Sequence, residues 1–238
     1  MRFIFSATIF VGFFLGLSIT VFTQSESRDQ VLGQIEAKRA ELATLEKKFL
    51  SPSEEDQAAY AVFLKQPDTG LIRLLPRETY DKETKLTIRG GGAYYSFVRL
   101  THAYGYGSDL ELQQEYLSVG FAGADYGMII KAGEVPLDEI SIEHPSAFFL
   151  SAYKPATDEP QARVEQRRFG AGTTIDGMPY SERVKAEVGM TYVVRSINYS
   201  ESDVLVAFKI IRKDTDGSLI IAWKLLKKYP KPELARNN

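Results

Sequence analysis

The spacing of apolar residues divides the chain into an apolar start, two helix-like stretches and a long region with strand-like patterns. No charged residue occurs between Phe3 and Phe22, and Arg2 precedes this run. Such a start is typical of a cleaved signal peptide or of an uncleaved membrane anchor, because the run is nearly long enough to span a bilayer. Neither Thr20 nor Thr23 offers an Ala-x-Ala cleavage pattern, so both interpretations stay open, with a cleaved signal slightly favoured. Both predict that the remainder lies outside the cytoplasm.

A helix is predicted from about Gln30 to Leu50, because apolar residues recur there at three-, four- and seven-residue spacings. The apolar stripe consists of Val31, Ile35, Leu42, Leu45 and Phe49. Lys38 interrupts it. The pattern favours two interpretations equally: a stalk that joins two copies of the chain, or an amphipathic helix that lies on the β domain.

A second helix is predicted to begin at Ser51. This serine has the character of an N-cap, Pro52 suits the first helical position, and Glu54 follows three residues after the cap. The apolar positions continue to Leu64, and Pro67–Gly70 ends the helix. The acidic residues at its start are therefore interpreted as helix-capping groups and not as metal ligands.

Three strands near the C-terminus are predicted to form an antiparallel meander. They span Thr191–Asn198, Val204–Arg212 and Leu219–Leu226. A two-residue loop between the last two strands would place Lys209 opposite Lys224, which repel each other. A four-residue loop instead places Phe208 opposite Trp223 and separates the lysines, so we expect that register.

Earlier strand patterns are less regular. Strands are predicted at Ala93–Thr101 and Leu110–Val119, and weaker ones at Ala147–Tyr153 and Val164–Phe169. His144 is interpreted as lying at the end of a strand.

The patterns together predict a mainly β protein: an antiparallel β-sandwich or barrel-like domain preceded by a signal or anchor and two helices. The expected boundaries are 1–24 for the signal or anchor, 25–67 for the helical stalk, 68–232 for the β domain and 233–238 for a tail.

The composition of the chain excludes several kinds of partner and functional site. The chain has 238 residues, a formal net charge of −2, two histidines and no cysteine. The charge argues against nucleic acid as a partner, and the missing cysteines exclude disulfides and thiolate chemistry. His102 and His144 show no metal-ligand spacing, so no metal is expected. No phosphate loop or Gly-x-Ser-x-Gly motif occurs, so no cofactor is expected.

Two segments, Gly90–Asp109 and Gly120–Gly127, concentrate glycine and tyrosine. Glycine beside tyrosine exposes an aromatic face that can stack on a flat ligand or a sugar ring, although tight turns explain the same composition. A continuous strand between the segments would hold them roughly 30 Å apart, whereas a break at Gln113–Glu115 would let them form one pocket. The candidate ligand-binding residues are Arg89, Tyr94, His102, Tyr104, Tyr106, Asp109, Asp125 and Tyr126.

These features predict an extracytoplasmic binding or envelope scaffold protein that uses the glycine–tyrosine loops and is not an enzyme. Its expected partners are a glycan or an envelope protein, the membrane through the N-terminal segment only, and a second copy of the chain through the stalk. The alternative is a secreted or periplasmic hydrolase of a glycan-like polymer. An apolar-lined groove would favour binding, and two facing carboxyl groups, one with a raised pKa, would favour the enzyme.

Overall fold

The computed structural model describes residues 27–81, 86–105 and 107–235. The predicted signal or anchor segment, residues 1–24, lies outside this part of the chain, and so does Tyr106. In the part that is described, no helix combines the length and the apolar character needed to cross a membrane. The chain divides into two compact units between Leu42 and Ala43.

The first predicted helix is confirmed as α1 (Arg28–Leu50). In the first unit its apolar side chains are exposed, including Val31, Ile35 and Leu42. The last residues of α1 belong to the second unit. There Leu50 is buried, and Phe49 packs edge-on against Tyr80 with ring centroids 5.6 Å apart.

The predicted start of the second helix is wrong by two residues. The N-cap of α2 (Glu54–Ala59) is Ser53, whose hydroxyl accepts from the Asp56 amide while the Asp56 carboxylate accepts from the Ser53 amide. This reciprocal pair uses Asp56 three positions after the cap, so it satisfies two backbone donors at once. Ser51 instead donates its hydroxyl to the Lys47 carbonyl at the end of α1 (2.7 Å). A short 3-10 helix, η1 (Phe63–Lys65), follows.

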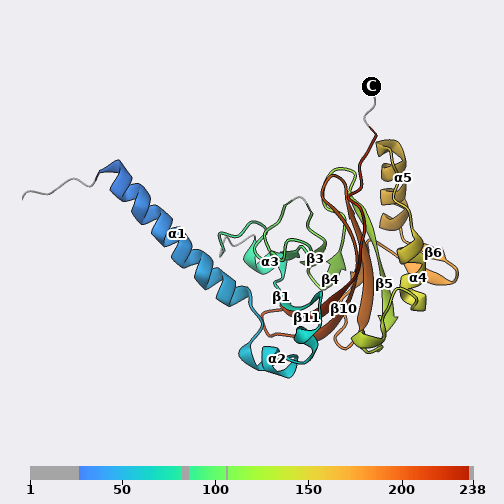
Figure 1. Cartoon of the computed structure of the whole chain (residues 1–238), viewed down its shortest axis with the longest axis horizontal. Coiled ribbons are helices and arrows are strands. Elements are labelled where there is room, and N and C mark those ends of the chain that lie inside the picture. Colours follow the sequence, from blue (N-terminus) through green and yellow to red (C-terminus); the bar gives the residue numbers. More distant parts are fainter. Residues whose placement is uncertain (1–26, 82–85, 106, 236–238) are drawn as a thin grey trace, which may run out of the picture. The chain divides into compact units, whose positions relative to one another are not determined.

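A five-stranded antiparallel sheet forms the centre of the second unit (Figure 1). Its strands, in spatial order, are β1 (Thr69–Leu74), β11 (Leu219–Lys228), β10 (Ser202–Lys213), β9 (Thr191–Asn198) and β5 (Tyr126–Gly133). The C-terminal meander is confirmed, and so is its register, because Phe208 lies opposite Trp223. The turn that joins β10 to β11 uses Gly217 with φ of 87°.

A smaller antiparallel sheet packs on one face of the central sheet. It contains β2 (Tyr94–Tyr95), β3 (Leu110–Gln113), β4 (Tyr116–Ser118) and β8 (Arg183–Lys185). Apolar residues of both sheets form one core, so the mainly β, sandwich-like expectation is confirmed. Both sheets are open in the described part of the chain and neither closes into a barrel.

Two strands in the smaller sheet are shorter than we expected. The predicted strand Ala93–Thr101 ends at Tyr95, and the chain then turns tightly, with Leu100 at φ of 53°. The predicted strand Leu110–Val119 is interrupted, because Gln114 adopts φ of 55° and turns the chain into the β3–β4 hairpin. The break that the polar residues at 113–115 would permit is therefore present.

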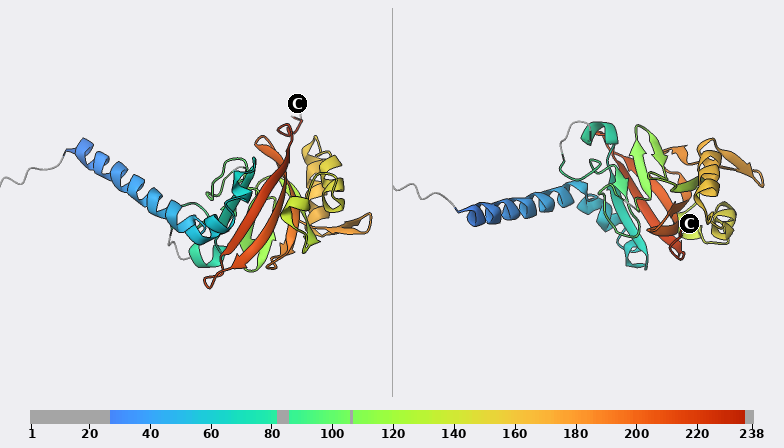
Figure 2. Two further views of the ribbon diagram at one scale, coloured as in Figure 1. Left: turned by 60° about the horizontal axis from the view of Figure 1, so that its bottom comes forward. Right: turned by 90° about the horizontal axis from the view of Figure 1, so that it is seen from above.

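Helices cover the other face of the central sheet (Figures 1 and 2). The weak strands predicted at Ala147–Tyr153 and Val164–Phe169 are wrong, since these residues lie mainly in α4 (Pro145–Ala152) and α5 (Glu159–Gly170). Proline within the first helical turn, where no intrahelical amide is needed, marks both starts. His144 is the N-cap of α4, where its Nδ1 accepts from the Ser146 amide (3.2 Å), and does not end a strand.

Three short elements complete the second unit. They are α3 (Arg77–Tyr80), the 3-10 helix η2 (Leu137–Glu139) and the hairpin of β6 (Thr173–Ile175) with β7 (Met178–Tyr180).

Candidate functional site

The glycine-rich segment from Ile88 to Tyr104 separates two cavities. Gly90 has φ of 82°, and a Cβ atom there would lie 2.6 Å from the Tyr94 ring. A Cβ atom at Gly91 would lie 2.4 Å from the Asp81 amide nitrogen. Only glycine allows the chain to pass this close to α3 and to the ring of Tyr94, so the glycine run brings the segment against both.

The first cavity, which we call the arginine–tyrosine cavity, has a volume of about 550 Å³. Its walls come from α3, the glycine run, β2, β3 and the segment after β4. The lining residues are Arg77, Asp81, Arg89, Gly90, Tyr94, Tyr104, Glu111, Gly120 and Phe121. It therefore unites three of the candidate residues, Arg89, Tyr94 and Tyr104, with one side chain of the second glycine–tyrosine segment, Phe121.

Aromatic contacts hold the two glycine–tyrosine segments together at this cavity. The Tyr94 ring lies 4.5 Å from that of Tyr104 and 5.3 Å from that of Phe121, centroid to centroid. Edge-to-face and tilted contacts at these separations are favourable arrangements of aromatic rings. Tyr94 is consequently buried, whereas Tyr104 is half-buried at the cavity wall.

Among the described residues that line the arginine–tyrosine cavity, the formal charges cancel. Arg77 pairs with Glu111 (2.9 Å) and with Asp81 (3.4 Å). The guanidinium of Arg89 lies 4.9 Å from the centre of the Tyr104 ring. No residue that the structure describes forms a hydrogen bond or an ion pair with the guanidinium of Arg89. The two arginines thus face the carboxylates of Asp81 and Glu111. The N–H donors of Arg89 remain available to a ligand.

The phenol of Tyr94 stays protonated in this setting. Burial raises its pKa, and the neighbouring Glu111 carboxylate raises it further. That carboxylate accepts hydrogen bonds from the Arg77 guanidinium (2.9 Å) and from the Ser118 hydroxyl (3.4 Å), which hold it in place.

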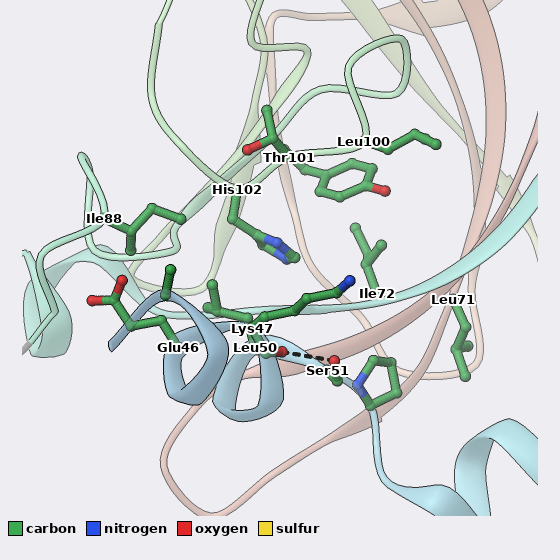
Figure 3. Close-up of a pocket in the computed structure, with 13 residues that line it drawn as sticks. Glu46, Lys47, Leu50, Ser51, Leu71, Ile72, Ile88, Leu100, Thr101 and His102 are labelled. Carbon is green, nitrogen blue, oxygen red and sulfur yellow. Dashed lines mark hydrogen bonds between the residues drawn. The ribbon is translucent and has the colours of Figure 1, made fainter. Parts of the chain in front are cut away.

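The second cavity, which we call the histidine cavity, has a volume of about 490 Å³ and lies beside β1 (Figure 3). Its lining residues are Ala43, Glu46, Lys47, Leu50, Ser51, Pro52, Leu71, Ile72, Ile88, Tyr95, Leu100, Thr101 and His102. His102 and Lys47 project from different walls into this space (Figure 3).

The protonation state of His102 follows from its contact with β1. Its Nε2 lies 2.9 Å from the Arg73 carbonyl oxygen, which can only accept, so Nε2 carries the proton. Burial lowers the pKa of His102 to about 4. The imidazole is therefore neutral near pH 7, and Nδ1 is left as an acceptor.

The remaining candidate residues are buried between the two sheets or under the helices. Asp109 has 0% exposure and accepts from the Phe97 amide (2.8 Å) and from Asn198 Nδ2 (2.9 Å). Asp125 accepts a hydrogen bond from the backbone amide of Tyr199 (2.8 Å), the residue that follows Asn198. Burial raises the pKa of each carboxyl group to about 6.

Tyr126 belongs to the core under the helices. It has 1% exposure, and its hydroxyl lies 2.9 Å from that of Tyr153. Tyr106 lies outside the described residues. The structure therefore gathers Arg89, Tyr94 and Tyr104 at one cavity and places His102 at another.

Sequence reasoning did not identify Arg77, Asp81 and Glu111 as site residues. In the sequence, only the i, i+4 spacing of Arg77 and Asp81, which is typical of a helical ion pair, indicated that these two residues interact. No sequence pattern indicated a buried role for Glu111, because an acidic residue on a short strand is ordinarily exposed.

Sequence reasoning also did not identify a third cavity, of about 420 Å³, which Arg195, Asp203 and Tyr229 help to line. Arg195 and Asp203 form an ion pair with side-chain exposures of 0% and 2%. The sequence pattern that could have indicated this buried ion pair is the presence of charged residues inside otherwise apolar strands.

Within the described residues, no cluster of three or more histidine, aspartate and glutamate side chains is arranged to hold a metal ion. No protein-family model, no curated protein and no solved structure matches this chain.

Proposed function

We propose that this chain is an extracytoplasmic binding protein or envelope scaffold that holds a neutral glycan in the arginine–tyrosine cavity and catalyses no reaction. The observation that carries the proposal is the balanced charge of the described lining residues beside aromatic rings in tilted and edge-to-face contact. The uncharged run between Phe3 and Phe22 supports a location outside the cytoplasm.

A neutral polyhydroxylated ligand fits this chemistry best. A guanidinium group only donates hydrogen bonds and a carboxylate only accepts them, whereas a sugar hydroxyl does both. Arg89 and Arg77 on one side and Asp81 and Glu111 on the other thus suit the two roles of vicinal hydroxyls. Because the formal charges of the described lining residues cancel, an anionic or cationic ligand gains no net attraction, and the aromatic side chains of the wall offer apolar contacts to a sugar ring.

The arrangement of carboxyl groups favours binding over hydrolysis. A glycosidase needs two carboxyl groups on opposite sides of the scissile bond, one of them acting as an acid with a raised pKa. Asp81 and Glu111 instead pair with the same arginine, Arg77. The carboxyl groups of Asp109 and Asp125, whose pKa values are raised, are buried and do not line this cavity.

The proposal is tested by titrating the full chain with a neutral β-glucan oligosaccharide, a chitin oligosaccharide and an oligogalacturonate, with calorimetric detection. We expect a neutral oligosaccharide to bind, and Tyr104→Ala or Arg89→Ala to weaken binding at least about tenfold, equivalent to roughly 1.4 kcal/mol. Tyr116→Ala is the matched control, because Arg183 lies over the Tyr116 ring at 4.3 Å outside the cavity.

Two outcomes would contradict the proposal. Equal losses of affinity in Tyr104→Ala and Tyr116→Ala would show that the oligosaccharide does not bind in the arginine–tyrosine cavity. Release of new reducing ends from either neutral oligosaccharide would favour the glycan hydrolase instead.

A further inference from the structure

The edge strand β1 turns part of its backbone toward the histidine cavity. In an antiparallel pair, alternate residues direct their backbone groups toward the partner strand and the others direct them away. Leu225 donates its amide hydrogen to the Asp68 carbonyl (2.8 Å), and Thr69 lies opposite Lys224. The register therefore directs the N–H and C=O of Leu71 away from β11.

Two contacts on the same edge agree with this direction. The Arg73 carbonyl lies 2.9 Å from Nε2 of His102, and the Leu75 amide donates to the Gly92 carbonyl (3.1 Å). The segments on either side of β2 thus cover the far end of the β1 edge. At Leu71, by contrast, no described residue pairs with the outward N–H or C=O.

The uncovered part of this edge lies against a recessed space. The histidine cavity is bounded by the end of α1 on one side and by Thr101 and His102 on another (Figure 3). Its volume of about 490 Å³ is that of a small-ligand pocket, which admits a few residues of extended chain and no folded element. Its walls carry both buried apolar side chains, Leu50 and Ile72, and polar side chains.

We propose that the histidine cavity binds an extended peptide segment of a partner protein, which adds to β1 as a further strand at Leu71. Main-chain hydrogen bonds would supply affinity, and the alternating side chains of the peptide would supply specificity. The peptide is expected to carry an uncharged apolar residue toward Leu50 and Ile72, and a hydrogen-bond donor toward Nδ1 of His102. This site uses none of the residues proposed to hold the glycan.

The experiment uses the absence of cysteine from the chain. Leu100 lines the cavity and has 62% exposure, so Leu100→Cys in the full chain can capture cysteine-terminated synthetic heptapeptides through a disulfide. The library randomises alternate positions between apolar and charged residues. Tethering raises the effective concentration of a weak binder to the millimolar range. Val62→Cys, with 78% exposure and outside the cavity, is the control.

We expect Leu100→Cys to enrich peptides with alternating apolar residues at least about tenfold over Val62→Cys, as added avidity predicts. Adding Leu71→Pro removes the outward N–H and no hydrogen bond to β11, which proline on an edge strand permits, and should reduce capture to the control level. Adding Leu71→Val keeps the N–H and should preserve capture. In the captured complex of the Leu71→Val variant, hydrogen exchange at residue 71 should slow at least about tenfold.

Three results would each overturn the proposal. The first is equal capture by the two cysteine variants. The second is capture that is insensitive to Leu71→Pro in a protein with unchanged circular dichroism. The third is rapid exchange at residue 71 in the captured complex, which stays measurable in the Leu71→Val variant even where the proline variant fails to fold. Loss of self-association in Leu71→Pro without loss of capture would assign this edge to a second copy of the chain.

Discussion

Tyr94 and Tyr95 are neighbours in β2, yet each lines a different cavity. Successive side chains of a strand point to opposite faces, so this two-residue strand separates the arginine–tyrosine cavity from the histidine cavity. The same alternation continues around it, with Arg89 and Tyr104 on one side and Ile88 and His102 on the other. The two proposed sites can therefore be changed separately, and their ligands could be held on one scaffold at the same time.

The first prediction concerns the contact between Trp223 and Gly70. A Cβ atom at residue 70 would lie 2.6 Å from the indole ring of Trp223, which has 5% exposure and packs against Phe97 at 5.2 Å. Gly70→Ala should therefore displace the indole, destabilise the protein by about 1–3 kcal/mol as overpacking does, and shift its fluorescence to longer wavelength. Trp223→Ala should cost roughly 3–5 kcal/mol.

Gly105→Ala provides the control, since nothing lies within 4 Å of a Cβ atom at that position. Its unfolding midpoint in urea should stay close to that of the wild type. A Gly70→Ala protein with unchanged stability and fluorescence would show that the indole does not lie over residue 70.

The same region shows how far the sequence alone could lead. The pairing of Phe208 with Trp223 was predictable, because one register places the like charges of Lys209 and Lys224 opposite each other, whereas the other register pairs apolar residues. The helices α4 and α5 were missed, since short apolar runs such as Ala147–Tyr153 fit a strand and a buried helix equally well. The deciding features are the prolines of the first helical turns, Pro145 and Pro160.

The composition of the sequence identified one wall of the arginine–tyrosine cavity and not the opposite wall. Glycine and tyrosine marked the segment that carries Arg89, Tyr94 and Tyr104. Arg77 and Asp81 come from α3, a helix of four residues, and reach the cavity only through tertiary packing. Local patterns hold no information on such contacts, which is why the charge balance of the cavity required the structure.

The second prediction is a pH dependence from His102. Its pKa is about 4 in the folded protein because of burial, below the roughly 6.5 of an unfolded histidine. The unfolded chain therefore binds the proton more readily between these values, so this group makes the free energy of unfolding rise with pH from about 4 to 6.5. His102→Gln should remove that rise, as measured by urea unfolding at intervals of half a pH unit.

Asp125 should act in the opposite direction. Its folded pKa of about 6 exceeds the unfolded value of roughly 3.9, so the folded protein holds the proton more tightly and stability falls with rising pH in this range. Asp125→Asn keeps the acceptor for the Tyr199 amide and should remove the fall. Two variants with parallel pH profiles would contradict both assignments.

The third prediction concerns the buried pair of Arg195 and Asp203. Arg195 Nη2 donates to Asp203 at 2.7 Å, and Nη1 donates to the Leu150 carbonyl at 2.7 Å. Removing one partner leaves an uncompensated charge, so Asp203→Asn should cost about 3–5 kcal/mol in urea unfolding. Replacing both residues together, Arg195→Met with Asp203→Leu, should cost much less. A double variant less stable than Asp203→Asn would show that the pair is net stabilising.

The last prediction concerns self-association through the first unit. Val31, Ile35 and Leu42 of α1 are exposed and occupy alternating core positions of a heptad, with Lys38 at the core position between the last two. A polar core residue lowers the stability of a coiled coil while fixing its register. Lys38→Leu should therefore strengthen self-association of the full chain in detergent, measured by sedimentation equilibrium.

Ile35→Asp should weaken the same association at least about tenfold, because it places a charge in the apolar seam. Ala37→Asp introduces the same side chain two residues away, off the stripe, and serves as the control for effects on the helix itself. A chain that sediments as a monomer at all concentrations, with Lys38→Leu included, would rule out the stalk as a dimerising helix. The apolar stripe of α1 would then need a different partner, because its side chains are exposed among residues 27–42, the described part of the first unit.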